Sequence, residues 1–204
     1  GMNSFLSIFL VIEIYLSLQW RMVHDSPILY YMGYLIAHRN AIPYRDFFDM
    51  NMPGAHWINA MAGMVFGFND SGFQRANVCI LITILILIFI WLRSFNRLAA
   101  WTGSLLFGIA FLQSGPAMSF QREFLALPFI LSALIVFTVE KRNLKIWGLI
   151  ISGLLIGLSV LIKPQTGLIL PILLVIHWFK SGPAMEKRDT GLKVRQIACM
   201  IAGF

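Results

Sequence analysis

The sequence predicts an all-α, polytopic membrane protein with about six transmembrane helices, the start of a seventh, and two interfacial helices in the first outer loop. Of its 204 residues, 58% are hydrophobic and 12% are charged, whereas a soluble domain has about 25% charged residues. The mean hydropathy is +0.77. Uncharged runs close to the length of a transmembrane helix recur along the chain, separated by charged positions.

The charges delimit the expected spans, because a charged side chain costs about 2.5 to 3.5 kcal/mol at the bilayer centre. The first span covers residues 4–20 and is interrupted only by Glu13, which we expect to face other helices. The other spans are the uncharged runs 76–92, 98–121, 124–139, 146–162 and 164–179. Because 197–204 reads as the start of a further apolar helix, we expect 1–204 to be the N-terminal part of one transmembrane module whose natural chain continues.

The positive charges predict the orientation of this module. With a cytoplasmic N-terminus, the short connections on the cytoplasmic side carry most of the Lys and Arg residues: Arg93, Arg97, Lys141, Arg142, Lys145, Lys180, Lys187, Arg188, Lys193 and Arg195. This arrangement follows the positive-inside rule and puts segment 21–74 outside the cytoplasm. The net charge of +7 is therefore interpreted as the charge that sets the membrane topology. With no basic stripe to follow a phosphate backbone, we expect no nucleic-acid partner.

Segment 21–74 is the one long connection, and it is too apolar and aromatic to be a solvated loop. Residues 27–38 and 53–68 each open with a proline, which suits the first turn of a helix, and each has an apolar or amphipathic face. We expect both to be helices lying in the membrane interface, where aromatic side chains are favoured. Between them, 40–52 contains Pro43 and three charged residues, which indicate an exposed loop of defined shape.

Asp25 follows the first span and directly precedes the first interfacial helix, next to His24. In a functional interpretation, it is a partly desolvated general base that takes a proton from an attacking hydroxyl. In a structural interpretation, it caps the N-terminus of the helix that begins near Pro27. The spacing alone favours the cap.

The loop 40–52 holds the densest polar cluster of the chain. Arg45 and the N-terminus of the helix at Pro53 could together bind a phosphate. Alternatively, Arg45 forms a salt bridge with Asp46 or Asp49 that only ties the loop. The residues alone leave these two interpretations equal.

Arg122 and Lys163 are expected at the outer ends of their spans. A cation at that depth can bind the phosphate of a lipid-linked substrate. Snorkelling, or a pair between Arg122 and Glu123, is the structural alternative for each cation taken singly. Three cations at one level, Arg45, Arg122 and Lys163, favour a common phosphate site.

Other site classes lack their patterns. Cys79 and Cys199 are too few for a disulfide framework or a cysteine zinc site. No metalloprotease, P-loop or nucleophile-elbow motif occurs. Among His38, His56 and His177, only His56 is expected near a site. The G-x-x-x-G patterns at 63–67 and 153–157 predict close helix packing.

The order of these elements resembles the N-terminal part of the polytopic C-type glycosyltransferases, the enzymes similar to protein O-mannosyltransferases and aminoarabinose transferases, with many bacterial family-39 members. The resembling positions are His24-Asp25-Ser26-Pro27, Gly33, Ala37, the run 42–49, Pro53-Gly54, Phe66-Gly67, Arg75, Gln121-Arg122-Glu123 and Lys163-Pro164-Gln165. The likeness covers most of 1–180. One departure is Ser26, because many relatives have glutamate directly after the aspartate.

The resemblance implies an integral membrane glycosyltransferase of the plasma (bacterial inner) membrane. Such an enzyme moves a sugar from a polyprenyl-phosphate donor to a lipid, glycan or protein acceptor at the outer, periplasmic face. By this resemblance Asp25 is the catalytic aspartate. Arg45, Arg122 and Lys163 are the donor-phosphate candidates, and Asp46, Asp49 and His24 orient the substrate. We expect no cofactor and no protein metal site, with a divalent metal left open. The alternative is a non-catalytic transporter or flippase, which would place its polar site nearer the bilayer midplane.

Overall fold

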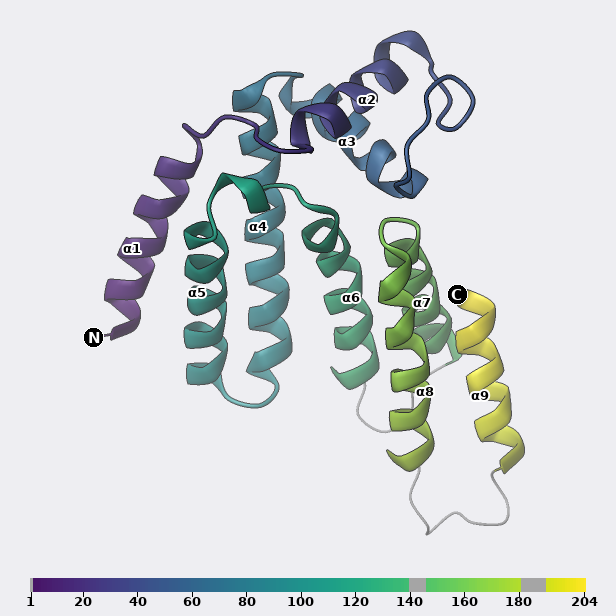
Figure 1. Ribbon diagram of the computed structural model, residues 1–204. Coiled ribbons are helices and arrows are strands. Elements are labelled where there is room, and N and C mark those ends of the chain that lie inside the picture. Colours follow the sequence, from purple (N-terminus) through teal and green to yellow (C-terminus); the bar gives the residue numbers. More distant parts are fainter. Residues whose placement is uncertain (1, 140–145, 181–189) are drawn as a thin grey trace.

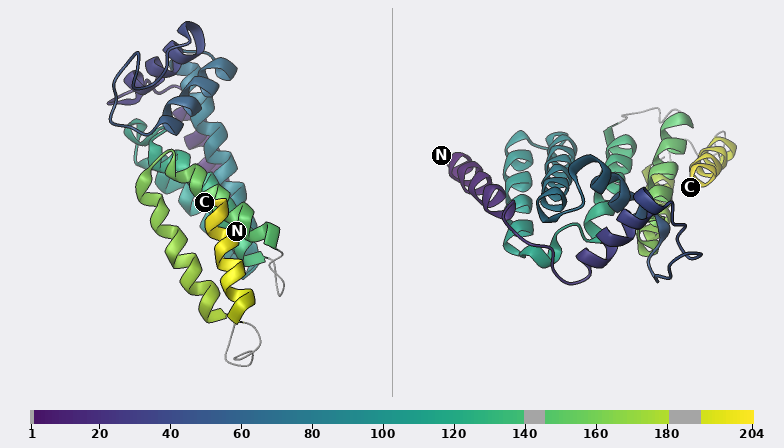
Figure 2. Two further views of the ribbon diagram at one scale, coloured as in Figure 1. Left: turned by 90° about the vertical axis from the view of Figure 1, so that its right-hand side faces the viewer. Right: turned by 90° about the horizontal axis from the view of Figure 1, so that it is seen from above.

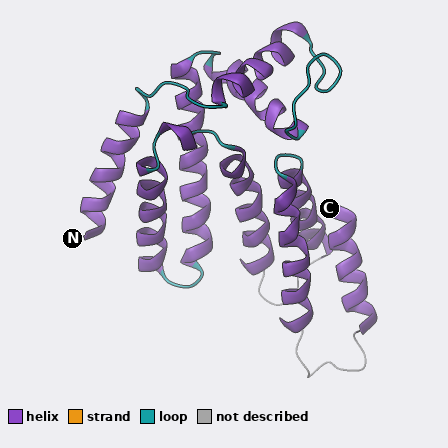
Figure 3. Cartoon of the chain, viewed as in Figure 1, coloured by secondary structure: helices purple, strands orange, loops and turns teal. Residues whose placement is uncertain are grey.

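The computed structural model describes residues 2–139, 146–180 and 190–204. Regular structure within these ranges is helical, and no β-strand occurs in them (Figure 3). The elements are α1 (Met2–Ser17), α2 (Ser26–Arg39), α3 (Pro53–Phe66), α4 (Asp70–Arg93), α5 (Arg97–Gln113), η1 (Pro116–Met118), α6 (Arg122–Val139), α7 (Ile146–Val160), η2 (Pro164–Leu168), α8 (Ile169–Lys180) and α9 (Thr190–Gly203). The all-α prediction is therefore confirmed.

Helices α4 to α9 stand side by side in alternating directions, and α1 flanks α5 (Figures 1 and 2). Helices α2 and α3 lie across one end of this row, which we call the α2–α3 end. The start of α6 and both 3-10 turns, η1 and η2, lie at the same end, whereas the N-terminus of α1 lies at the other. Segments that are distant in sequence and carry candidate site residues thus share one end of the molecule.

Only α4, of the described helices, is both long and apolar enough to be a candidate membrane span by length and composition. It covers 24 residues, and the expected span 76–92 lies inside it. Helix α1 and segments within α7 and η2–α8 are shorter apolar helices. Five of the cations that predicted the orientation lie outside the described residues: Lys141, Arg142, Lys145, Lys187 and Arg188.

In two of the uncharged runs, the observed helix covers only part of the run. The run 98–121 is interrupted after Gln113, because Gly115 has a φ of 81° and Pro116 begins the η1 turn. The run 164–179 opens with the 3-10 turn η2, and α8 begins only at Ile169. The helix boundaries predicted from the charges are therefore wrong in these two runs. Glycine and proline can end a helix where no charged residue occurs.

Within the described residues, the apolar interior forms three clusters along the row. The first joins α2 and α3 to α4 and α6 through Tyr30, Ala55, Phe73 and Leu125, with Phe120 and Ile162 from the adjoining turns. The second joins α1, α4, α5 and α6, and the third joins α6 to α7, α8 and α9. Helix α6 contributes to all three clusters. The orientation of its first residue, Arg122, is therefore tied to the whole interior.

Glycine allows close approach at two helix contacts. A Cβ on Gly153 of α7 would lie 2.0 Å from the carbonyl oxygen of Met200 in α9, and one on Gly157 would lie 2.7 Å from that of Phe204. The predicted G-x-x-x-G packing is thus confirmed at 153–157. A Cβ on Gly33 of α2 would lie 2.7 Å from the backbone nitrogen of Ala60 in α3, so these two helices also need a glycine to pack.

The pattern at 63–67 has a different role. A Cβ on Gly63 would meet the ring of Phe68, which follows the same helix, and Gly67 has a φ of 96° at the C-terminus of α3. The prediction of helix packing at 63–67 is wrong, because these glycines terminate α3 and fold the chain back. The helix accordingly ends at Phe66 and not at Phe68.

Polar contacts fix α1 and the layer formed by α2 and α3. Glu13 accepts a hydrogen bond of 2.9 Å from Gln113 of α5, which agrees with the expectation that it faces another helix. The Tyr30 hydroxyl donates to the Gly67 carbonyl over 2.8 Å, and the Asp70 carboxylate accepts from the backbone N–H of Met22 over 3.0 Å. The first bond joins α2 to the C-terminus of α3, and the second joins the segment before α2 to the start of α4.

Candidate active site

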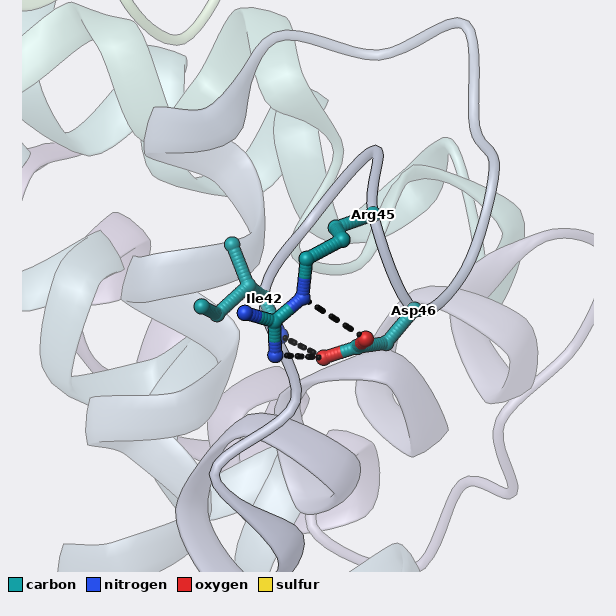
Figure 4. Close-up of polar contacts among 3 residues, drawn as sticks. All are labelled: Ile42, Arg45 and Asp46. Atoms are coloured by element: carbon teal, nitrogen blue, oxygen red, sulfur yellow. Dashed lines mark hydrogen bonds and ion pairs between the residues drawn. The ribbon is translucent and has the colours of Figure 1, made fainter.

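The loop between α2 and α3 owes its shape to a bidentate ion pair. Arg45 Nε and a terminal nitrogen each donate to one oxygen of Asp46 over 2.9 Å, and the backbone N–H of Ile42 donates to the same carboxylate over 2.8 Å (Figure 4). The Arg45 guanidinium and then the Ile42 amide lower the pKa of Asp46 to about 2. Both side chains are exposed. Of the two sequence interpretations of Arg45, the structure contains the loop-tying pair, with Asp46 as the partner.

Asp49 lies deeper, where the loop meets α3. Its side chain is 16% exposed, and Asn51 Nδ2 donates to its Oδ2 over 2.6 Å. The same oxygen lies 3.2 Å from Nε2 of His56, whose side chain is completely buried in α3. The edge of the Phe47 ring packs against the imidazole, with the ring centroids 5.5 Å apart. Asp49 therefore belongs to a buried polar group and Asp46 to the exposed part of the loop.

His56 was the histidine expected near the site, but it was not among the predicted site residues. Burial lowers the pKa of His56, the positive charge of Arg122 lowers it further, and the Asp49 carboxylate opposes both. Burial and Arg122 thus favour the neutral form of the ring. Neither ring nitrogen has a hydrogen-bond partner of good geometry among the described residues. A histidine four positions into a mostly apolar helix was the sequence signal that could have identified it.

Arg122 is the first residue of α6, and specific contacts fix the turn before it. The backbone N–H of Phe120 donates to Asn77 Oδ1 over 2.9 Å, and Phe120 has a φ of 59°. Such a conformation costs about 1 to 3 kcal/mol outside glycine, which burial of the Phe120 ring, worth about 1.5 to 3 kcal/mol, offsets. Asn77 adds about 0.5 to 1.5 kcal/mol more through its hydrogen bond. The direction in which α6 begins, and with it Arg122, is fixed by this turn.

The Arg122 side chain has no ion pair among the described residues, and its buried Nε lacks a hydrogen-bond partner there. Its neighbour Glu123 instead forms an ion pair with Lys163. Lys163 is the residue before η2 and follows the buried Ile162. The structure thus brings Lys163 to the start of α6, as expected for two cations at the same level. Glu123, which the sequence suggested as a partner for Arg122, is the ion-pair partner of Lys163 instead.

A backbone contact brings α3 to the same place. The N–H of Gly54 donates to the carbonyl of Leu161 over 2.9 Å, and a Cβ on Gly54 would lie 2.5 Å from that oxygen. Glycine is required here, since any side chain would separate the two segments. This contact sets the start of α3 beside the turn that carries Lys163.

Asp25 and His24 lie at the start of α2. Asp25 is the N-cap residue by position, but its side chain makes no capping hydrogen bond, and its carbonyl accepts from the N–H of Leu29 over 3.0 Å. The structural interpretation of Asp25 as a side-chain cap is therefore wrong. His24 has a φ of 54°, and both side chains are exposed. Within the described residues, no hydrogen bond or ion pair joins Asp25 to Arg45, Arg122 or Lys163.

The described residues contain no group of three or more His, Cys, Asp or Glu side chains placed to hold a metal ion. What the α2–α3 end does contain is a half-buried arginine without an ion pair at a helix N-terminus, and a buried histidine in contact with a partly buried carboxylate. Such an arrangement can bind a phosphate group through charge-assisted hydrogen bonds.

Comparison with known proteins identifies the family. The family model of dolichyl-phosphate-mannose-protein mannosyltransferases matches residues 51–194, well over half of the chain. The chain belongs to this family. The mannosyltransferase match includes His56, Arg122 and Lys163, and begins after Asp25, Arg45, Asp46 and Asp49. No curated protein and no solved structure matched the chain.

Membership confirms the resemblance to the C-type glycosyltransferases. The mannosyltransferase family is one of membrane glycosyltransferases that use a lipid-linked sugar donor. The broad expectations of transferase activity and a membrane environment therefore hold for this chain.

Proposed function

We propose that the protein is an integral membrane glycosyltransferase that moves a sugar from a polyprenyl-phosphate donor to an acceptor at the outer, periplasmic membrane face. The donor phosphate binds at the start of α6, and the reaction is displacement at the anomeric carbon with the lipid phosphate as leaving group. Positive charge at that phosphate stabilises the negative charge that develops as the bond breaks.

The observation that carries the proposal is the unpaired Arg122. Its guanidinium has no ion pair within the described residues and its Nε is buried without a partner. A buried donor without a partner costs about 1 to 3 kcal/mol, and a phosphate oxygen would recover this cost. The guanidinium suits the task because it can donate two parallel hydrogen bonds to one phosphate.

Lys163 and Arg45 have secondary roles in phosphate binding. Lys163 approaches the same helix start but is paired with Glu123, so it contributes positive charge to the phosphate while its position is set by that carboxylate. Arg45 is held by Asp46 and would have to release it before contacting a phosphate. We therefore assign the direct phosphate contact to Arg122.

The acids and His24 complete the proposal. Asp25 remains the general base, since its carboxylate is exposed and is not used as a helix cap. Asp49 is the stronger of the two loop candidates for orienting the sugar or acceptor, because it lies next to His56, whereas Asp46 is used within the loop. His24 is adjacent to Asp25 and assists in orienting the acceptor.

Two variants of the full-length protein in lipid nanodiscs test these assignments. Binding is measured with radiolabelled decaprenyl-phosphate mannose, and turnover is measured as release of decaprenyl phosphate in the presence of envelope from a strain that lacks the protein. Arg122→Gln should weaken donor binding on the order of tenfold or more, because a charge-assisted bidentate contact is worth about 1.5 to 3 kcal/mol. Asp25→Asn should bind the donor normally and lose turnover.

Arg93→Gln is the matched control, because Arg93 ends α4 at the opposite end of the row and is exposed. It should bind and turn over like the wild type. Donor binding unchanged in Arg122→Gln would refute the phosphate assignment, and turnover retained in Asp25→Asn would refute the base.

A further inference from the structure

The ion pair between Glu123 and Lys163 lies at the helix start that we assign to the donor phosphate. Glu123 is the second residue of α6, directly after Arg122, and its carboxylate pairs with Lys163 from the turn between α7 and η2. Acidic side chains and phosphates are favoured at a helix start for the same reason, since both meet free N–H groups and a partial positive charge there. The chain thus supplies an anion of its own at this position.

The ion pair is weak enough to be exchanged for another. The Glu123 side chain is 52% exposed and that of Lys163 is 28% exposed, so water screens their attraction. A phosphate monoester carries more negative charge than a carboxylate and has three terminal oxygens, so it competes well for an ammonium group. The Lys163 ammonium can therefore pass from Glu123 to a phosphate bound at the start of α6.

The backbone at Lys163 is fixed, so that only the side chain has to move in this exchange. The N–H of Lys163 donates to the Ser159 carbonyl over 2.9 Å, and its carbonyl accepts from the Thr166 hydroxyl over 2.8 Å. The preceding residue, Ile162, is buried in the first apolar cluster. Beyond this fixed point the ammonium group is carried by a flexible four-carbon chain. Exchange of Glu123 for a phosphate thus needs a new side-chain rotamer and no change of fold.

Arg122 and Lys163 differ in what each gives up on binding a phosphate. Within the described residues the Arg122 guanidinium has no ion pair, and its Nε is buried without a hydrogen-bond partner. Arg122 can therefore bind a phosphate without losing a contact. Lys163 has to leave Glu123 first, so the carboxylate opposes the contribution of the second cation.

We infer that Glu123 competes with the lipid phosphate for Lys163: its carboxylate holds the ammonium group in the lipid-free protein, and the phosphate displaces it on binding. This inference rests on the proposed function. Glu123 is a positioning residue, because it acts through Lys163, and it lowers the affinity for the lipid phosphate. The same competition favours release of the polyprenyl phosphate product, since the carboxylate recovers Lys163 as the lipid leaves.

The test measures binding of decaprenyl phosphate, without sugar, to the full-length protein in nanodiscs. Glu123→Gln should bind this lipid about twofold to fivefold more tightly, the effect of freeing one partly exposed cation. In a Lys163→Gln background the same substitution should have no effect, because the group for which the two anions compete is absent. Glu13→Gln is the matched control, since Glu13 bonds to Gln113 between α1 and α5, and it should bind like the wild type.

Two results would overturn the inference. If Glu123→Gln binds like the wild type or more weakly, the carboxylate does not compete with the phosphate. If the gain in affinity persists in the Lys163→Gln background, Glu123 repels the phosphate directly and does not act through Lys163. Should Glu123→Gln not give folded protein, Glu123→Ser replaces it in both comparisons, because serine also suits the start of a helix.

Arg122→Gln in the same assay separates this inference from the proposed function. Weak binding in Arg122→Gln together with unchanged binding in Glu123→Gln overturns only the role of Glu123. Normal binding in Arg122→Gln overturns the phosphate site itself.

Discussion

The side-chain oxygen of Asn77, in the second turn of α4, accepts a hydrogen bond of 2.9 Å from the backbone of Phe120, 43 residues further along the chain. Asn77 is completely buried, and Phe120 has a left-handed backbone conformation two residues before α6. Helix α4 thus holds the turn from which α6 begins. The position of Arg122 therefore depends on a bond between distant segments as well as on its sequence neighbours.

Asn77→Leu should therefore destabilise the protein and weaken donor binding together. It leaves the Phe120 N–H buried without an acceptor, at a cost of about 1 to 3 kcal/mol, and it releases the turn before Arg122. Thermal unfolding in detergent and binding of decaprenyl-phosphate mannose are the two measurements.

Gln74→Met is the comparison, one helical turn earlier. Gln74 is completely buried, and its amide oxygen and nitrogen have no hydrogen-bond partner in the described residues. Replacing an unsatisfied amide with an apolar chain of similar size should leave stability unchanged or raise it. Equal destabilisation by both variants would show that the Asn77 bond has no special role.

The stability of the protein should fall on mild acidification because of His56. Its pKa is lowered in the folded state, mainly by burial and then by Arg122, so below the ordinary value of 6.5 the unfolded chain takes up a proton that the folded chain does not. Stability is therefore fully present above that pH and is lost as the pH falls toward the folded pKa. The unfolding temperature of His56→Gln should depend less on pH between about 7.5 and 5.5 than that of the wild type. His38→Gln should follow the wild type.

The Arg45–Asp46 pair should control the loop without controlling global stability. Both side chains are solvent-exposed, so Asp46→Asn should leave the unfolding temperature nearly unchanged. It removes the carboxylate that ties Arg45 and the Ile42 amide, so limited proteolysis within 40–52 should become faster. Because the pKa of Asp46 is lowered to about 2, its contribution is present above the ordinary value of 3.8 and is lost only as the pH falls toward 2. Acidification to pH 5 should leave the wild-type loop as protease-resistant as at pH 7.

The contact between α7 and α9 should tolerate no side chain at Gly153. A Cβ there would lie 2.0 Å from a backbone carbonyl of α9, and backbone cannot move as a rotamer can. Gly153→Ala should lower stability by about 1 to 3 kcal/mol, the usual cost of overpacking. Gly103→Ala should cost less, since its Cβ would meet only the end of the Leu92 side chain. Thermal unfolding of the two variants in the same detergent gives the comparison.

The proposed outer location of the α2–α3 end can be tested by labelling. Phe48 is 82% exposed in the loop, so Phe48→Cys, in a background with Cys79 and Cys199 changed to Ser, should react with a membrane-impermeant maleimide on intact spheroplasts. Ser94→Cys, at the exposed turn after α4 at the other end of the row, should react only after permeabilisation. The reverse pattern would invert the topology and remove the basis for an outer active site.

Local patterns in the sequence predicted the helices of the outer layer well. Pro27 and Pro53 begin the first turns of α2 and α3, as expected for proline at the start of a helix. The expected 27–38 differs from α2 by one residue at each end. These boundaries depend on backbone chemistry within a few residues, which a sequence displays directly.

The site was less predictable, because its pairings depend on contacts between distant segments. Arg122 and Glu123 are adjacent in sequence, yet Glu123 pairs with Lys163, which lies 40 residues away. Asp46 and Asp49 were equivalent candidates in the sequence, and only the path of the loop separates an exposed acid from one beside His56. Charge patterns identified which residues gather at the α2–α3 end, but not which of them remain unpaired.

The backbone bond from Gly54 to Leu161 joins the outer layer to the turn between α7 and η2. A tilt of α7 relative to α6 would therefore also move α3 and the loop 40–52 that precedes it. The start of α3 and the loop 40–52 would then shift together with the end of α7.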